Sequence, residues 1–109
     1  MVLDAGVTYE QTWHAMEELV REGLVRNIGV SNVGTQKIRD VLSYAKIKPA
    51  VLQVEMHPYL VQAKLLRMAR ENGIQVTAFS SLASGSYVEL GGASVDESPC
   101  NLPQVIEIA

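Results

Sequence analysis

The stretch AVLQVE at residues 50–55 is the segment that decides the fold. Apolar residues run almost without interruption from Ala50 to Val54, as in a strand that is covered on both faces. Pro49 restricts the residue before it to extended geometry and so opens the strand. Gln53 interrupts the run, and an amide buried without hydrogen-bond partners costs roughly 1–3 kcal/mol. The segment therefore predicts a parallel strand carrying one polar group that needs an explanation.

Helical and strand patterns alternate on both sides of this segment. Two more strands are predicted at residues 25–30 and 74–79, and helices are predicted at residues 8–23, 34–45 and 60–73. Thr8 and Gln11 have capping-box spacing, and Gly23 suits the end of the first helix. Such alternation implies parallel strands joined by right-handed crossovers. The fold class is therefore α/β, and both the open doubly wound sheet and the closed (β/α)8 barrel remain candidates.

The first predicted helix has two faces. Its apolar stripe consists of Trp13, Met16, Leu19 and Val20. The opposite side, which we expect to face solvent, carries Glu10, Glu17, Glu18 and Arg21. His14 and Glu17 are three residues apart, but without further ligands they indicate a solvated pair and no metal site.

Composition excludes several classes of function. The chain has 109 residues, is 48% hydrophobic and has a formal net charge of −3, so no nucleic-acid or anionic-membrane partner is indicated. No apolar run approaches the roughly 20 residues that span a bilayer. The first residues lack the pattern of a signal peptide, and the single cysteine, Cys100, cannot form a disulfide framework. The cytoplasm is the expected location.

Polar residues follow each predicted strand at its carboxyl end. They are Ser31 and Asn32, then Gln53 and Glu55, then Ser80 and Ser81. At a single junction, caps and turns are the favoured interpretation of such residues. Three junctions in register favour a ligand site, because both candidate architectures bind ligands at the carboxyl ends of their strands.

The region after the third strand changes character. Residues 84–102 are rich in Gly, Ser, Asp and Pro and are predicted to form a loop. A helix is predicted from Pro103 onward. Three strands are far fewer than a complete barrel of about 250 residues requires. We therefore expect an open sheet edge, exposed apolar surface and self-association of the isolated chain. The residues expected to be exposed are Ile28, Val30, Val51 and Val76.

Three motifs in order resemble the aldo-keto reductase family. Residues 13–17 (WHAME), 22–26 (EGLVR) and 28–32 (IGVSN) resemble its fourth helix and fifth strand. Residues 48–55 (KPAVLQVE) with 57–60 (HPYL) resemble its sixth strand and the start of the next helix. Residues 76–82 (VTAFSSL) resemble its seventh strand. Within the family, the leucine before Gln53, the Ser-Ser pair and residues 86–90 (SYVEL) are most similar to the xylose-reductase-like branch.

The resemblance implies a partial (β/α)8 TIM barrel of about three consecutive βα units, with residues 1–109 forming part of one domain. It also implies NADPH-dependent reduction of aldehydes or ketones, sugars among them, to alcohols. In the matching motifs, Ser31, Asn32 and Gln53 would bind the nicotinamide carboxamide, and Phe79 would stack on the ring in place of the family's common Tyr. Ser80, Leu82 and Ser84 would approach the pyrophosphate. Ser81 and Ala83 replace a frequent Pro and a frequent Gly.

The same resemblance places the catalytic residues elsewhere. The family's tetrad of Asp, Tyr, Lys and His precedes the fourth helix, so no catalytic residue is assigned in this chain. We expect a central to C-terminal fragment that is inactive in isolation. A non-catalytic half-barrel that associates or binds nucleotide, and a complete small doubly wound domain, remain alternatives. The carbonyl substrate, the choice between NADPH and NADH, and the oligomeric state are left open.

Several other candidates are given structural roles. His57 lies beside Glu55 at a strand end, but its motif places it in the loop to the next helix. Tyr59 and Tyr87 have no nearby lysine in a recognisable frame. Gly91 and Gly92 lack the following Lys and Ser or Thr, and the strand-turn-helix context, of a phosphate loop. No metal site is predicted.

Overall fold

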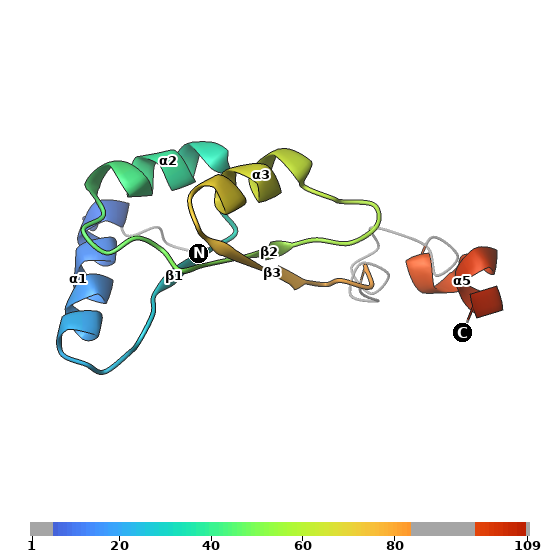
Figure 1. The fold of residues 1–109 in the computed structure, drawn as a ribbon, viewed down its shortest axis with the longest axis horizontal. Coiled ribbons are helices and arrows are strands. Elements are labelled where there is room, and N and C mark those ends of the chain that lie inside the picture. Colours follow the sequence, from blue (N-terminus) through green and yellow to red (C-terminus); the bar gives the residue numbers. More distant parts are fainter. Residues whose placement is uncertain (1–5, 84–97, 109) are drawn as a thin grey trace.

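A computed structural model describes residues 6–83 and 98–108 of the chain (Figure 1). Helices and strands alternate along the first part, as the sequence pattern predicts. The elements are α1 (Tyr9–Arg21), β1 (Gly29–Ser31), α2 (Thr35–Tyr44), β2 (Val51–Glu55), α3 (Ala63–Glu71), β3 (Gln75–Phe79), the 3-10 turn η2 (Pro99–Asn101) and α5 (Pro103–Ile108). Among these, no helix has the length and apolarity to cross a bilayer.

The three strands form one parallel sheet in the order β1-β2-β3. Val30 pairs with Leu52, and Leu52 pairs with Val76. Consecutive strands are therefore spatial neighbours, with a helix in each crossover. In Figure 1, α2 and α3 lie on one side of the sheet, and the other side is not covered by any described element. The expected α/β arrangement of consecutive βα units is confirmed.

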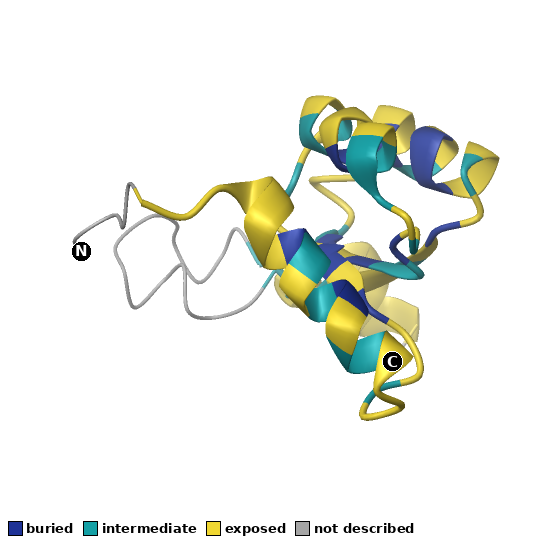
Figure 2. Cartoon of the chain, turned by 90° about the vertical axis from the view of Figure 1, so that its left-hand side faces the viewer, coloured by how far each residue is buried: buried dark blue, intermediate teal, exposed yellow. Residues whose placement is uncertain are grey.

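The core lies between the helices and the covered face of the sheet. Ile38 and Val41 of α2 and Leu52 of β2 are fully buried. Trp13 of α1 is also buried, and its indole N–H donates to the Ile47 carbonyl at 3.1 Å. In Figure 2 the buried positions, in dark blue, lie in the helices and along the strands. A core on one face explains how a three-stranded unit holds together.

The sequence expectation of exposed apolar strand residues is wrong for three of the four positions. Ile28 and Val30 are only 4% and 6% exposed, and Val76 is half-buried against the core. Strand alternation turns Val30 and Val76 toward the helices. Of the four residues, only Val51 lies on the uncovered face, where it is half-buried.

The uncovered face, which we call the open face, is mainly polar. Alternation assigns to it Gly29, Ser31, Val51, Gln53, Glu55, Gln75, Thr77 and Phe79. Gly29 permits a close approach here, because a Cβ at this position would lie 2.5 Å from the Val51 carbonyl oxygen. The residues that lack a covering layer are therefore different from those predicted from the sequence, and more polar.

Some element boundaries also differ from expectation. The predicted strand at residues 25–30 is shortened to Gly29–Ser31, because the amides of Leu24 and Val25 donate to the Leu19 carbonyl at the end of α1. The third helix begins at Ala63 and not at Leu60, because Leu60 pairs with His57 in an antiparallel bridge.

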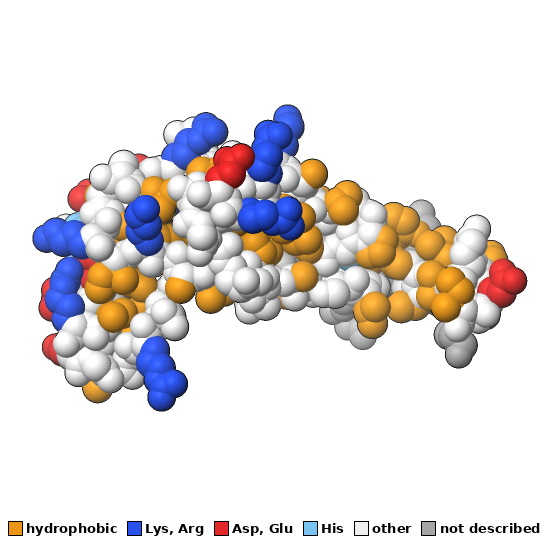
Figure 3. All heavy atoms as spheres, in the orientation of Figure 1, with side chains coloured by type: hydrophobic (Ala, Val, Ile, Leu, Met, Phe, Trp, Pro, Cys, Tyr) orange, Lys and Arg blue, Asp and Glu red, His pale blue; other side chains and the backbone are white. Residues whose placement is uncertain are grey.

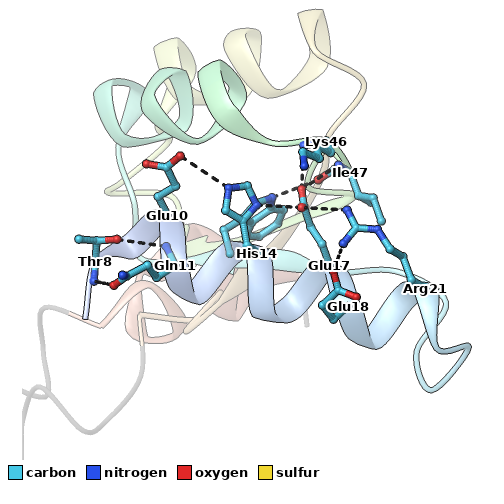
Figure 4. Close-up of polar contacts among 10 residues, drawn as sticks. Thr8, Glu10, Gln11, His14, Glu17, Glu18, Arg21, Lys46 and Ile47 are labelled. Atoms are coloured by element: carbon cyan, nitrogen blue, oxygen red, sulfur yellow. Dashed lines mark hydrogen bonds and ion pairs between the residues drawn. The ribbon is translucent and has the colours of Figure 1, made fainter. Parts of the chain in front are cut away.

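Glu17 overturns the expectation of a solvated pair on α1. Its side chain is fully buried, and Oε1 accepts hydrogen bonds from the amides of Lys46 at 2.7 Å and Ile47 at 2.9 Å. Oε2 lies 2.9 Å from His14 Nδ1 and 3.3 Å from an Arg21 nitrogen (Figure 4). Helical periodicity gives no information about the loop after α2, which supplies the two amides.

These contacts hold Glu17 in its charged form. Burial by itself raises the pKa of Glu17, but the hydrogen bonds from Ile47, His14 and Lys46 outweigh it. Together with the charge of His14, they lower the pKa from 4.5 to about 2. The carboxylate thus joins α1 to the segment between α2 and β2.

The capping box of Thr8 and Gln11 at the start of α1 is present as predicted.

The last described segment comprises η2 and α5. The helix predicted from Pro103 is confirmed, and part of the predicted loop, at Pro99–Asn101, forms a 3-10 turn. Ile106 and Ile108 of α5 are exposed. Figure 3 shows apolar side chains gathered toward this end, whereas lysine and arginine side chains are spread over the helical layer. The rest of that predicted loop, residues 84–97, lies outside the described residues.

Candidate functional site

The candidate site lies on the open face, near the carboxyl ends of the strands. Ser31 of β1 is the register partner of Gln53 of β2, and Gln53 is the register partner of Thr77 of β3. All three are exposed. Register partners in a parallel sheet share a face and lie about 4.8 Å apart across the strands. One polar side chain from each strand therefore stands in a single row, which we call the polar row.

Asn32 follows the polar row directly. Its amide donates to the Gln53 carbonyl at 3.0 Å, which continues the pairing of β1 and β2 by one residue. Its φ of 54° is left-handed, a conformation that asparagine tolerates better than most residues. The chain turns there toward α2, and the side chain of Asn32 is left exposed beside Ser31.

Phe79 ends β3 on the same face as Thr77, two residues further along the strand. Its register partner is Glu55, and its carbonyl accepts from the Met56 amide at 3.2 Å. The ring is half-buried. An aromatic surface therefore borders the polar row on its carboxyl side.

Residues 80–83 form a tight turn after β3. The Ala83 amide donates to the Ser80 carbonyl at 2.8 Å, and the φ angles of these two residues are 48° and 50°. A left-handed alanine is strained, by roughly 1–2 kcal/mol. Glycine, which the resemblance leads one to expect at Ala83, would avoid this cost. Leu82 is 69% exposed, and Ser84 lies outside the described residues.

The loop after β2 is held by His57, in agreement with its predicted structural role. The Tyr59 amide donates to His57 Nδ1 at 3.3 Å, so Nδ1 is an acceptor and the proton of a neutral ring is on Nε2. Nε2 lies 2.9 Å from Glu55 Oε1 and donates to it. Gln62 Nε2 also donates to the Glu55 carbonyl at 3.2 Å. This imidazole therefore organises the loop beside Phe79.

The groups that the candidate site offers suit the binding and orientation of a ligand. Within the described residues, the side chains of Ser31, Asn32 and Gln53 make no hydrogen bond, so their donors and acceptors face outward. Hydroxyl and amide groups each offer both functions, which suits a planar primary carboxamide. No group of three or more His, Cys, Asp or Glu side chains in the described ranges could hold a metal ion.

The structure brings together most of the residues predicted from sequence and adds one. Ser31, Asn32 and Gln53 are adjacent, and Phe79 borders them on the same face. The turn with Ser80 and Leu82 follows directly. Thr77 was not predicted as a site residue. Its signal was present in the sequence as a polar residue two positions before Phe79, but only the register places it beside Gln53.

A three-stranded parallel sheet with helices in its crossovers defines an α/β unit, and its polar strand ends form the candidate ligand site. The aldo/keto reductase family model matches residues 2–99. The chain belongs to this family, as the sequence motifs indicated.

Individual relatives agree with the assignment. The chain is 54% identical over 80 residues to the 4-dihydromethyl-trisporate dehydrogenase of Mucor mucedo, covering 73% of this chain and 25% of that protein. It is 54% identical over 86 residues to the NADPH-dependent D-xylose reductase of Candida boidinii, covering 79% of this chain and 27% of the relative. The chain therefore spans about a quarter of the length of these curated relatives.

Solved structures of the family superpose on the fold. The aldose reductase of Giardia lamblia matches with a TM-score of 0.70 and 47% sequence identity, over 72% of this chain and 25% of that one. The aldose reductase of Schistosoma japonicum matches with a TM-score of 0.66 and 39% identity, over 79% and 30% of the respective chains.

Proposed function

We propose that this chain is the nicotinamide-binding segment of an aldo-keto reductase that uses NADPH to reduce aldehydes or ketones, sugars among them, to alcohols on a (β/α)8 barrel. The observation that carries the proposal is the register of Ser31 with Gln53 on the exposed open face. The names of the relatives support the cofactor and the substrate class, because one of them is called an NADPH-dependent D-xylose reductase.

Three residues would hold the carboxamide of the cofactor. Gln53 offers an amide that can donate and accept at once, and Ser31 and Asn32 stand beside it on β1 and at its end. Fixing the carboxamide decides which face of the nicotinamide ring is presented to a substrate. Phe79 lies at the end of β3, where its ring can stack on the nicotinamide. When bound, NADPH supplies the hydride.

The turn after β3 would approach the pyrophosphate. Ser80 and Leu82 lie in that turn, and Ser84 follows it. Hydroxyl groups and backbone amides of such a turn suit an anionic group. The left-handed residues Ser80 and Ala83 set the path of this segment.

We propose that the acid–base residues of the reaction are not among these 109 residues. Two described groups could be mistaken for them. The Tyr44 hydroxyl is buried without a described partner, and burial, followed by the charges of Asp40, Tyr9 and Glu10, raises its pKa. A proton donor needs the opposite shift. His57 is engaged by Glu55 and the Tyr59 amide.

We also propose a cytoplasmic location and self-association of the isolated chain. The outer edges of β1 and β3 pair with no described strand, and β3 has no lysine or proline of the kind that commonly protects sheet edges.

The experiment that tests the proposed function compares nicotinamide with nicotinate. Nicotinate carries a carboxylate where nicotinamide carries the carboxamide, and the two are otherwise the same. Two-dimensional amide NMR of the isolated chain should therefore show chemical-shift changes at Ser31, Asn32 and Gln53 with nicotinamide and much smaller changes with nicotinate. An assay with NADPH and D-xylose should show no turnover above background. Equal responses to both ligands would contradict the binding assignment, and measurable turnover would contradict the assignment of catalysis to residues elsewhere.

A further inference from the structure

The His57 ring lies between two partners of opposite kind at the edge of the candidate site. Its side chain is only 10% exposed. Nε2 lies 2.9 Å from Glu55 Oε1, and Nδ1 accepts a hydrogen bond from the Tyr59 amide at 3.3 Å. The neutral ring can make both contacts at once, because one nitrogen carries a proton and the other carries a lone pair.

The loop that contains this ring is anchored on both sides of Tyr59. The amides of His57 and Leu60 each donate to the carbonyl of the other, at 3.3 Å and 2.8 Å. The Met56 amide, directly before His57, donates to the Phe79 carbonyl at 3.2 Å. Between these anchors, Tyr59 is 57% exposed, and its amide has Nδ1 of His57 as its acceptor. The order of the loop at Tyr59 therefore depends on the lone pair of one imidazole nitrogen.

Protonation of the ring removes that lone pair. In the imidazolium both nitrogens are donors, so Nδ1–H would face the donating Tyr59 amide and their hydrogen bond is lost. Nε2–H can still donate to the Glu55 carboxylate, and that hydrogen bond becomes charge-assisted. The carboxylate thus keeps the ring in place while its other nitrogen changes from an acceptor to a donor. Histidine is the side chain that ordinarily makes this change near neutral pH.

The charged group in contact with His57 favours the protonated ring. From β2, Glu55 supplies a carboxylate, and from the loop the Tyr59 ring meets the imidazole edge-on at a centroid distance of 6.3 Å. β3, with the sequence QVTAF, contains no titratable side chain. At the start of α3, Lys64 is exposed and has no hydrogen bond or ion pair to His57 within the described residues.

We propose that His57 is a pH-sensitive latch on the loop at residues 57–60. The latch is closed when the ring is neutral and accepts from the Tyr59 amide, and it is open when the ring is protonated. Its opening frees the Tyr59 segment beside Phe79, at the border of the candidate site. The latch operates in the chain without a ligand, so it does not depend on the proposed function.

An NMR titration of the full chain from about pH 8 to about pH 5 tests the latch. The chain has two histidines, so the ring signals of His57 are assigned by their loss in His57→Asn. This variant is also the matched control, because an asparagine side chain can accept from the amide two residues further on and does not titrate. Glu55→Gln keeps an acceptor for Nε2–H and removes the charge.

The expected result links one backbone amide to one ring. In the original chain, the Tyr59 amide should shift with the same midpoint as the His57 ring. Its hydrogen exchange, corrected for the intrinsic effect of pH, should become roughly threefold to tenfold faster at the acid end. In His57→Asn, the Tyr59 amide should stay protected at every pH. In Glu55→Gln, both midpoints should move together to lower pH, because the charge that favours the imidazolium is gone.

Several outcomes would overturn the latch. One is a His57 ring that does not titrate in this range, or a Tyr59 amide that stays unchanged while the ring titrates. Another is an amide that follows the midpoint of His14, or that keeps its pH dependence in His57→Asn. The amide of Leu52 in the core reports unfolding. If it loses protection at the same midpoint, the change is not confined to the loop and the latch is ruled out.

Discussion

The helical layer and the open face treat polar groups in opposite ways. Where α1 meets the segment between α2 and β2, Glu17 is fully buried, and two backbone amides, His14 and Arg21 surround its carboxylate. On the open face, the side chains of Ser31 and Gln53 are exposed, with no hydrogen bond to any described residue. The same few strands and helices hold both arrangements.

This difference separates polar groups that hold the fold from polar groups that are available to a ligand. A buried polar group that is fully satisfied inside the protein holds the fold, because leaving its partners unpaired is costly. A polar group that a strand presents to the outside without an internal partner can bind a ligand without first breaking an internal bond. By this reasoning, Glu17 belongs to the scaffold and the polar row to the candidate site.

The largest expected effect comes from removing the satisfied group. Glu17→Ala leaves the amides of Lys46 and Ile47 without their acceptor, so we expect the free energy of unfolding to fall by roughly 2–5 kcal/mol. Urea unfolding followed by circular dichroism measures this change. Glu18→Ala is the matched control, since Glu18 is an exposed neighbour on α1 that pairs with Arg21. Equal losses of stability in both variants would show that Glu17 has no special role in holding the fold together.

The pH dependence of stability tests the same carboxylate. The folded-state pKa of Glu17 is lowered to about 2, so its contribution is complete above the ordinary value of 4.5 and is lost as pH falls toward 2. Glu17→Gln should therefore be less stable than the original chain at pH 6, and the gap should shrink as the pH is lowered through that window. A gap that stays constant with pH would contradict this assignment.

Gly29 tests the close contact between β1 and β2, and a smaller effect is expected. In Gly29→Ala, the new Cβ would meet the Val51 carbonyl oxygen, which belongs to the backbone and cannot rotate away. We expect a loss of roughly 1–3 kcal/mol in urea unfolding. Gly34→Ser is the contrasting variant, because Gly34 caps α2 in open space without a side-chain hydrogen bond. Serine there should raise the free energy of unfolding by a few tenths of a kcal/mol. If Gly29→Ala and Gly34→Ser destabilised the chain to the same extent, the close approach at Gly29 would not be the cause.

Local signals explain how much of this fold could be predicted from the sequence. The capping box of Thr8 and the left-handed Gly23 act within one turn of helix, so their residues were correctly interpreted. The two amides that bind Glu17 lie about thirty residues away from it, and the shortening of β1 depends on how α1 ends. Thr77 became part of the site only through the register of β3. Helical and strand periodicity carry no information about contacts between distant segments.

The smallest expected loss of stability is that of Gln53→Met, and its neighbour Leu52 on the same strand provides the contrast. Leu52 is fully buried on the covered face, and Gln53 is exposed on the open face. Leu52→Ala should cost roughly 2–5 kcal/mol, whereas Gln53→Met, which keeps the length of the side chain, should change the free energy of unfolding by less than about 0.5 kcal/mol. The same Gln53→Met chain should no longer distinguish nicotinamide from nicotinate in the amide NMR titration. A large loss of stability in Gln53→Met, with ligand preference retained, would mean that Gln53 supports the fold as Glu17 does. The contrast between buried, paired polar groups and exposed, unpaired ones would then no longer identify the candidate site.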